Sequence, residues 1–321
     1  MLVCGDLPTM TDSTPLHVPI LPDDGDRPGQ YRGARRAFAT RLFNRAVYQL
    51  DRDISGVVGF IGAGLWHNVW EASVEDERWV LRIPHGPPLP EHDVRLLREA
   101  RVLNWVRTRA VDLRVPRPVA LVHTCFGLAS LQTFVPGAPV EGSARVAAVA
   151  SAARACHRIP VPFDWEWLES YPTRRDHALE RLERARVVDL PEARDACAWV
   201  EAHLPPDEPA SLLHGDLLPQ NVLVTEDDAL VAIDWAEAMV GDPAYDFCIV
   251  NRGIRRPLGE PDARRRLLDA YHAAGGSQTV TMEHVRGQEL SLMLDWLAVE
   301  ASPQDNDEAL NRLRSLLKRT K

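Results

Sequence analysis

The stretch "LLHGDLLPQNVLV", residues 212–224, sets a histidine, an aspartate and an asparagine between two short apolar runs. Runs of Leu and Val of this length are typical of short buried strands. Functional side chains are often carried on a loop that such a scaffold holds in place. The stretch therefore predicts two short strands joined by a loop that carries chemistry.

The spacing of the polar residues resembles the catalytic loop of protein kinases. Asp216 precedes Asn221 by five positions, and Asp234 follows the apolar run "ALVAI". In protein kinases, an aspartate at this place accepts the proton of the substrate hydroxyl, and the asparagine holds magnesium. Two strands in a hairpin would return Asp234 beside Asn221. Hard oxygen ligands of this kind suit Mg²⁺, which stabilises the charge of a moving phosphoryl group.

Together with "VAIDWAEAMVGDPAYDF" (residues 231–247), the stretch resembles the aminoglycoside/macrolide phosphotransferase family. The signature of that family is "HGD…N" followed by "IDW…GDP…D". The resemblance implies that Asp216 is the catalytic base of a phosphotransferase and that Asn221 and Asp234 are ligands of Mg²⁺. It further implies a protein-kinase-like fold with ATP or GTP as the phosphate donor.

The same resemblance assigns supporting roles to three other polar residues. His214 would shape the loop, and Asp242 and Asp246 would brace the lobe through hydrogen bonds. For these two aspartates a structural role is also the first expectation from the residues alone, because Asp commonly caps turns and backbone amides.

A glycine pair marks a candidate phosphate-binding turn. "FIGAGLWHNVWEA" (residues 60–72) places Gly62 and Gly64 between two predicted strands, where bare backbone can approach phosphate oxygens. An ordinary β-turn is the alternative for two glycines in a hairpin. The family has a similar G-W-x-N segment, which favours the phosphate-binding interpretation.

An arginine stands where protein kinases use a lysine. "WVLRIP" (residues 79–84) puts Arg82 at that place, and the only lysines of the chain are Lys318 and Lys321. Arginine can contact phosphate with two donors and stays charged. Glu99 is the best match for its helix partner, with Glu91 as a second candidate.

"SLQTFVPGAPV" (residues 130–140) is the predicted hinge between two lobes. A purine ring would lie against backbone groups from about Gln132 to Val135. Side chains contribute little to such a contact, so ATP and GTP both remain possible.

Hydrophobic periodicity predicts an α+β fold of two lobes, and the family resemblance implies that this fold is protein-kinase-like. Residues 1–30 are rich in proline without an apolar period, and we expect a mobile extension. Residues 31–137 predict a small, mainly antiparallel β-rich N-lobe of about five strands with one inserted helix, which binds the nucleotide. Residues 138–321 predict a larger α-helical C-lobe that carries catalysis and acceptor binding.

Composition narrows the class of protein. With 45% hydrophobic and 26% charged residues the chain reads as soluble and globular, and a net charge of -9 argues against a nucleic-acid partner. The five cysteines form no CxxC pair, which favours a reducing compartment. No membrane-spanning apolar run or secretory signal is evident, so we expect a cytoplasmic protein. Oligomeric state cannot be inferred.

The acceptor is the least determined part of the function. "PFDWEWLESY" (residues 162–171) offers Trp165 and Trp167 as an acceptor wall, although a helix with a buried and a solvated face is the preferred interpretation. The family phosphorylates macrolides, aminoglycosides and some sugars or amino alcohols. "WVLRIP" and the "IDW" stretch favour the macrolide branch, whereas Asn221 departs from the histidine of many macrolide kinases. A non-catalytic nucleotide-binding regulator is the alternative class, supported by the missing lysine.

Overall fold

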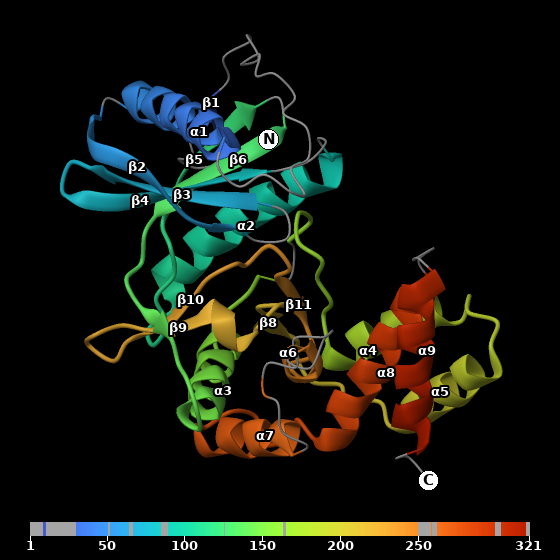
Figure 1. Cartoon of the computed structure of the whole chain (residues 1–321). Coiled ribbons are helices and arrows are strands. Elements are labelled where there is room, and N and C mark those ends of the chain that lie inside the picture. Colours follow the sequence, from blue (N-terminus) through green and yellow to red (C-terminus); the bar gives the residue numbers. More distant parts are fainter. Residues whose placement is uncertain are drawn as a thin grey trace. The chain divides into compact units, whose positions relative to one another are not determined.

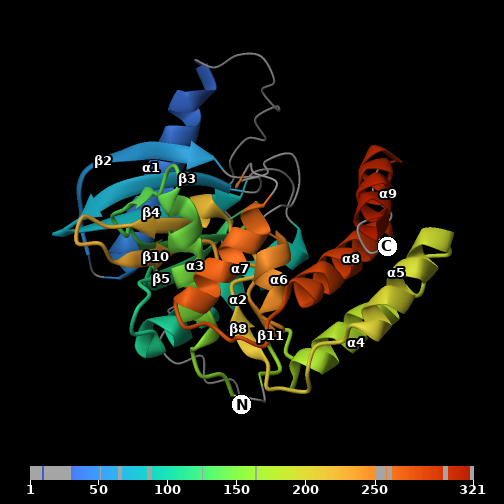
Figure 2. The ribbon, with the colours of Figure 1, turned by 90° about the horizontal axis from the view of Figure 1, so that it is seen from below.

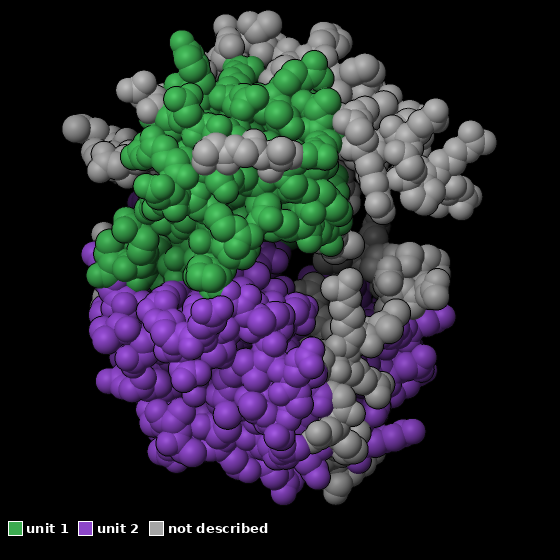
Figure 3. Space-filling view, turned by 60° about the vertical axis from the view of Figure 1, so that its left-hand side comes forward, with its two compact units in different colours: residues 1–108, 115–136 green, residues 109–114, 137–321 purple. Residues whose placement is uncertain are grey.

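The chain divides into two compact units, shown in green and purple in Figure 3. Unit 1 comprises residues 1–108 and 115–136, and unit 2 comprises residues 109–114 and 137–321. Gly64 and most of the expected extension at 1–30 lie outside the described residues. No helix of the described part is long and apolar enough to cross a membrane. The structure, a computed structural model, describes residues 9–10, 30–50, 52–63, 67–84, 89–124, 126–162, 165–249, 258, 262–298 and 303–318.

Unit 1 is built on a six-stranded sheet with the order β1-β5-β6-β4-β3-β2. The five longer strands pair antiparallel, as the alternating apolar runs predict. The short β1 pairs parallel with β5, and the sequence did not predict it because two residues carry no periodicity. The strands are β1 (Thr9–Met10), β2 (Ile54–Ala63), β3 (His67–Val74), β4 (Glu77–Pro84), β5 (Pro118–Thr124) and β6 (Gly127–Thr133).

Two helices cover opposite faces of this sheet, α1 (Gln30–Gln49) and α2 (Pro90–Arg109) (Figure 1). The apolar stripe of α1, with Phe43 fully buried at its centre, joins one cluster with the sheet residues Leu81 and Leu131. On the other face, Leu96 and Ala100 of α2 pack with Leu121 and Leu128. Successive residues of a strand point to opposite faces, so both faces of the sheet are buried.

A short link between α2 and β5 belongs to unit 2. The backbone N–H of Arg114 donates to the Leu230 carbonyl at 2.8 Å, and the Arg114 carbonyl accepts from the Ala232 N–H at 3.0 Å. The Arg114 side chain also forms an ion pair with Asp227 at 2.7 Å. Strand-like pairing therefore holds this segment on unit 2, although it lies in sequence between two elements of unit 1.

Short strands form the centre of unit 2. β8 (Ser211–Leu213) pairs antiparallel with β11 (Met239–Gly241). β9 (Val222–Val224) pairs antiparallel with both β10 (Leu230–Ala232) and β7 (Ala138–Pro139). The loop from β8 to β9 contains a 3₁₀ turn at Pro219–Asn221. The hairpin of β9 and β10 is the one that the spacing of Asn221 and Asp234 predicts.

Helices make up the remainder of unit 2 in two groups (Figures 1 and 2). In the first group, α3 (Ala144–His157) contacts the short strands β8, β9 and β10 and packs against α7 (Ala263–Ala273), while α6 (Ala244–Ile249) contacts α7 and, more extensively, the second group. The second group packs together and consists of α4 (Arg174–Ala185), α5 (Pro191–Ala202), α8 (Met282–Ala298) and α9 (Pro303–Lys318). Periodicity predicts all of these except α6, which is too short to show a helical period.

Candidate active site

The loop between β8 and β9 folds back on Asp216. The side-chain amide of Asn221 donates to the Asp216 carbonyl at 2.8 Å and to its Oδ2 at 3.1 Å. The backbone N–H of Leu218 also donates to the Asp216 carbonyl, at 2.7 Å. These bonds hold the carboxylate of Asp216 and the carboxamide of Asn221 side by side. The Asn221 oxygen is the acceptor end that these bonds do not use.

Asp234 follows directly on the β9–β10 hairpin. The N–H of Ile233 donates to the Asn221 carbonyl at 3.0 Å, which extends the strand pairing to the residue before Asp234. Asp234 itself has a φ of 66°, in the left-handed region that aspartate tolerates better than most residues. The structure thus brings Asp216, Asn221 and Asp234 together at one end of the hairpin.

His214 links the loop to the segment before Asp234. Its Nε2 lies 3.0 Å from the Ile233 carbonyl, and its Nδ1 lies 3.3 Å from the backbone N of Asp216. A carbonyl only accepts and a backbone N–H only donates, so Nε2 carries the proton and Nδ1 accepts. Burial lowers the pKa of His214, and the nearby carboxylates of Asp246 and Asp234 offset this only in part. The ring is therefore neutral, as this arrangement requires.

The buried carboxylate of Asp246 accepts hydrogen bonds from the backbone of the loop. Its Oδ2 accepts the N–H of His214 at 3.0 Å and its Oδ1 accepts the N–H of Gly215 at 2.8 Å. His157 of α3 places Nε2 at 3.0 Å from the same Oδ2. Burial raises the pKa of Asp246, but the hydrogen bond from His157 and the interactions with His214 and the Gly215 amide outweigh it and lower the pKa. The group is a buried, fully bonded carboxylate.

Asp242 ties the corner between β11 and α6 to two distant helices. Its Oδ1 accepts from Arg174 Nε of α4 at 2.8 Å, and its Oδ2 accepts from Gln288 Nε2 of α8 at 3.2 Å. Its backbone N–H donates to His177 Nδ1 at 2.9 Å. Burial and the neighbouring arginines lower the pKa of His177 well below its usual value, so this ring is a neutral acceptor.

Sequence reasoning missed four of these partners, namely His157, Arg174, His177 and Gln288. They come from three separate helices and have no fixed spacing from the motif. One weak signal was present for His157, which is the only histidine of the alanine-rich stretch "SARVAAVASAARACHRI" (residues 143–159). For the others only the tertiary structure reveals the contact.

In unit 1, Arg82 of β4 and Glu99 of α2 form a buried ion pair. Arg82 Nη1 lies 2.7 Å from both Oε1 and Oε2 of Glu99, and the two side chains are only 11% and 3% exposed. Glu91 lies in the exposed first turn of α2. Glu99, rather than Glu91, is thus the residue that the structure pairs with Arg82.

Gly62 shares a row of the sheet with Arg82. Gly62 is paired with Val69, and Val69 with Arg82. Directly opposed residues of neighbouring strands point to the same face. No other atom lies within 4 Å of the position that a Cβ of Gly62 would take. The side of Gly62 on which a Cβ would lie is therefore open within the described part of the chain, although the residue as a whole is half-buried.

The predicted hinge residues continue from β6. Gln132 pairs with Val80 of β4, and the N–H groups of Thr133 and Phe134 donate to the carbonyls of Arg117 and Arg78, at 2.9 and 2.7 Å. Val135, the next residue, is half-buried. The sheet therefore uses the amides up to Phe134.

Within the stretch 162–171 the described residues 165–171 are not helical, and the preferred interpretation of them was wrong. Residues 166–168 form a turn, and the backbone groups of Glu169 and Tyr171 pair with Val240 of β11 instead of with each other in a helix. The helix begins only at α4, where Thr173 and Asp176 form a capping box. Trp165 is 8% exposed and packs against Trp167, with ring centroids 4.8 Å apart. Only Trp167, which is half-buried, offers ring surface to a ligand.

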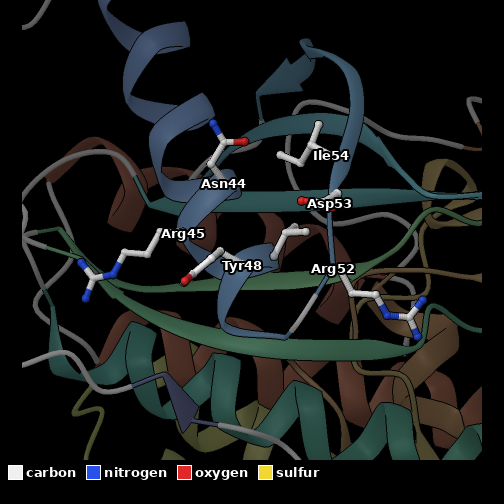
Figure 4. Close-up of a pocket in the computed structure, with 7 residues that line it drawn as sticks. Asn44, Arg45, Tyr48, Arg52, Asp53 and Ile54 are labelled. Carbon is white, nitrogen blue, oxygen red and sulfur yellow. The ribbon is translucent and has the colours of Figure 1, made fainter.

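Two surface depressions lie away from the predicted residues. One of about 380 Å³ lies between the end of α1 and the start of β2 (Figure 4). Its Arg45 and Arg52 side chains extend away from each other, which does not suit a shared ligand. The other, of about 500 Å³, lies on α4 and is lined by Tyr171, Asp176, Leu179, Glu180, Leu182, Glu183 and Arg186.

Comparison with known proteins adds a family and a fold. The sequence model described as "Phosphotransferase enzyme family" matches residues 58–290. The curated protein YcbJ of Bacillus subtilis (strain 168), described as uncharacterized, is 38% identical over 78 residues, which cover 24% of this chain and 24% of that protein. The chain therefore matches about a quarter of the length of this relative.

Solved structures match over most of the chain. A macrolide 2'-phosphotransferase type I is 21% identical, with a TM-score of 0.59 over 87% of this chain and 96% of that chain. The macrolide 2'-phosphotransferase MphH from Brachybacterium faecium is 20% identical, with a TM-score of 0.59 over 89% and 97%. A GDP complex of aminoglycoside 2'-phosphotransferase-IIIa is 16% identical, with a TM-score of 0.60 over 89% and 99%. These matches confirm the expected two-lobed, protein-kinase-like α+β fold.

Replacement of Gly215 by alanine should destabilise the protein strongly. Gly215 has a φ of +79°, and an added Cβ would lie 1.8 Å from the Glu237 carbonyl oxygen. We expect a loss of several kcal/mol in the free energy of unfolding, measured by urea denaturation. Gly142 is the matched control, because it has a φ of +63° and open space around its Cβ position. Gly142→Ala should cost only about 1 kcal/mol, and equal losses in both variants would contradict the clash.

The stability of the fold should fall at mildly acidic pH. Because the pKa of His214 is lowered in the folded chain, the unfolded chain binds more protons below about pH 6.5. The free energy of unfolding therefore decreases as the pH falls through this window. His214→Asn keeps an acceptor near the Nδ1 position but does not titrate. Denaturation at about pH 5.5 and 7.5 should show a smaller difference for this variant than for the wild type. An unchanged difference would exclude His214 as the titrating group.

Proposed function

Because the chain belongs to the phosphotransferase enzyme family, we propose that it is a small-molecule kinase that transfers the γ-phosphate of ATP or GTP to a hydroxyl group. The observation that carries the proposal is the arrangement around Asp216. Its carboxylate accepts from Asn221 at 3.1 Å, and its backbone carbonyl accepts from the same side-chain amide at 2.8 Å. A catalyst of phosphoryl transfer needs this kind of positioning more than it needs covalent chemistry.

In the proposed reaction Asp216 is the base. The acceptor oxygen forms a bond to the γ-phosphorus while the bond from that phosphorus to the β,γ-bridging oxygen breaks, and the hydroxyl proton passes to the Asp216 carboxylate. The nucleoside diphosphate leaves with the bridging oxygen. Because the transition state is loose, a carboxylate of ordinary basicity is sufficient. The bond from Asn221 orients this carboxylate and keeps it in place.

Asn221 and Asp234 would hold Mg²⁺. Among the residues that the structure describes, no group of three or more His, Cys, Asp or Glu could bind a metal ion. An amide oxygen and one carboxylate nevertheless fit Mg²⁺, which usually takes one or two protein ligands together with phosphate oxygens and water. When bound, Mg²⁺ neutralises charge on the phosphates. The Asn221 amide is turned to suit this role, since its nitrogen faces Asp216.

Unit 1 would bind the nucleotide. Arg82 replaces the usual lysine, and its ion pair with Glu99 holds the guanidinium in one orientation. Gly62, on the same face of the sheet, leaves backbone accessible to phosphate oxygens. The N–H of Val135 would bond to the purine, because the amides of the two preceding residues are already used in the sheet. A contact through backbone admits either ATP or GTP.

The acceptor that we propose is a hydroxyl of a macrolide or aminoglycoside antibiotic, which phosphorylation would inactivate. The names of the structural relatives support this class. Trp167 could add ring contacts. A metabolic sugar or amino alcohol remains the alternative acceptor. The missing lysine is little reason to expect a non-catalytic regulator, because Arg82, which is paired with Glu99, would take the role of that lysine.

Replacement of Asp216 by asparagine should abolish transfer without abolishing nucleotide binding. We expect kcat to fall by a factor of about 100 or more, since the base is lost. The assay incubates the protein with ATP or GTP and a panel of macrolides and aminoglycosides, and mass spectrometry detects the phosphorylated product. Asp227→Asn, an exposed change in the same unit, should retain activity. Full turnover by Asp216→Asn would contradict the assignment of the base.

Replacement of Asp234 by asparagine should remove the effect of Mg²⁺ on nucleotide affinity. Asparagine tolerates the left-handed backbone of this position but lacks the charge. Asp228 is the matched control, because it also has a positive φ, of 58°, and is exposed. Calorimetric titration of ADP with and without Mg²⁺ should show the metal effect in the wild type and Asp228→Asn only. A normal metal effect in Asp234→Asn would exclude this ligand.

A further inference from the structure

A chain of buried polar groups connects α7 to the loop that carries Asp216. Tyr271, near the end of α7, is 1% exposed, and its hydroxyl oxygen lies 3.1 Å from His157 Nδ1. His157 Nε2 in turn lies 3.0 Å from Asp246 Oδ2. We propose that Tyr271 is a positioning residue for phosphoryl transfer, which acts by donating its O–H to His157. This inference rests on the proposed function for its effect on the reaction, but not for the contact itself.

The hydrogen-bonding capacity of each group determines which atom donates and which accepts between Tyr271, His157 and Asp246. A carboxylate only accepts, so the nitrogen that faces Asp246 carries a proton. A neutral His157 ring then has its lone pair on Nδ1, which needs a donor. The Tyr271 hydroxyl is that donor. Its oxygen accepts a hydrogen bond from the Ser277 backbone, and burial raises its pKa to about 12, so the phenol keeps its proton at neutral pH.

The position of the Tyr271 ring is tightly defined. Its centroid lies 4.8 Å from that of Phe247 and 5.5 Å from that of His157. On another side, a Cβ added at Gly276 would meet ring carbons at 2.4 Å, so this glycine permits close contact. The Gly276 N–H also donates to the Tyr271 carbonyl at 2.9 Å. The hydroxyl is therefore held where it meets His157.

The loop that follows α7 is anchored as well. Ser277 Oγ lies 2.8 Å from Thr279 Oγ1, and Arg174 Nη1 donates to the same Thr279 oxygen at 2.7 Å. Arg174 is the residue that binds Asp242. Through Thr279 and Arg174, the loop at Ser277 is thus connected to Asp242, the second buried aspartate of the site. The loop that bonds to the Tyr271 hydroxyl is therefore anchored.

Loss of the Tyr271 hydroxyl would change the state of His157. With no donor at Nδ1, the lone pair of the buried ring has no partner, and the ring can turn to find one. Such a turn weakens its bond to Asp246, the carboxylate that binds the N–H groups of His214 and Gly215. The backbone before Asp216 would shift. The effect belongs to kcat more than to nucleotide affinity, because the shifted backbone directly precedes Asp216, whereas the direct nucleotide contacts are proposed for unit 1 and the Mg²⁺ ligands are Asn221 and Asp234.

Tyr271→Phe tests the proposal, with His272→Phe as the matched control. His272 is adjacent, and its Nε2 lies 3.0 Å from the Val280 carbonyl, so the control also removes one bond between α7 and the following loop. Imidazole ¹⁵N spectra of the wild type should show His157 neutral and protonated on Nε2. In Tyr271→Phe only, the backbone amide signals of His214 and Gly215 should shift. The same variant should lower kcat about fivefold and change the nucleotide KM by less than about twofold.

Several results would overturn the proposal. These are a wild-type His157 protonated on Nδ1, unmoved amide signals in Tyr271→Phe, an unchanged kcat, or equal effects in the two variants. The spectra need no substrate. If the wild type transfers phosphate to no acceptor, the proposed function fails, and the ring state and amide signals alone decide whether Tyr271 positions the loop.

Discussion

A buried carboxylate, that of Asp246, governs the geometry of the candidate site. An ionised group removed from water must be satisfied by hydrogen bonds or opposite charge, or it destabilises the fold by several kcal/mol. Asp246 is fully buried and finds its partners in the backbone of the loop itself, at His214 and Gly215, and in His157. The loop therefore cannot relax without leaving a charge unpaired. Because this buried charge must stay hydrogen-bonded, it restrains the backbone of the residues that precede Asp216.

A second buried aspartate extends this support into the helices. Asp242 lies only four positions before Asp246, yet it contacts Arg174 and Gln288 on α4 and α8 instead of the loop. Arg174 is 2% exposed and also reaches Glu208 at 2.9 Å, so its own charge is balanced twice. Removing one partner of a buried ion pair destabilises the fold by more than the intact pair stabilises it. The remaining charge is then buried without water or an opposite charge. Asp242 in this way connects α4 and α8 to the segment between β11 and α6.

A neutral histidine takes part in each of these two hydrogen-bond networks, His214 near Asp246 and His177 near Asp242. His214 and His177 are buried, and burial is the first cause of the low pKa of each. A neutral ring can accept from a backbone N–H, which an imidazolium cannot do. His214 and His177 accept in this way from Asp216 and Asp242, respectively. The site thus depends on which ring nitrogen carries the proton, and not only on which residues are present.

The sequence by itself determined the antiparallel sheet, the longer helices and the residues of the loop, because strand alternation, helical period and motif spacing are local patterns. It also indicated Arg82, with Glu99 as the best match for its partner through the family resemblance, but the choice of Glu99 over Glu91 came from the structure. Only the tertiary structure decided the partners of Asp242 and Asp246, which come from α3, α4 and α8. It also showed a turn at residues 166–168 where a helix was expected, and it showed α6, which is too short to have a period. A buried charge selects partners by distance in space, and no sequence spacing records that distance.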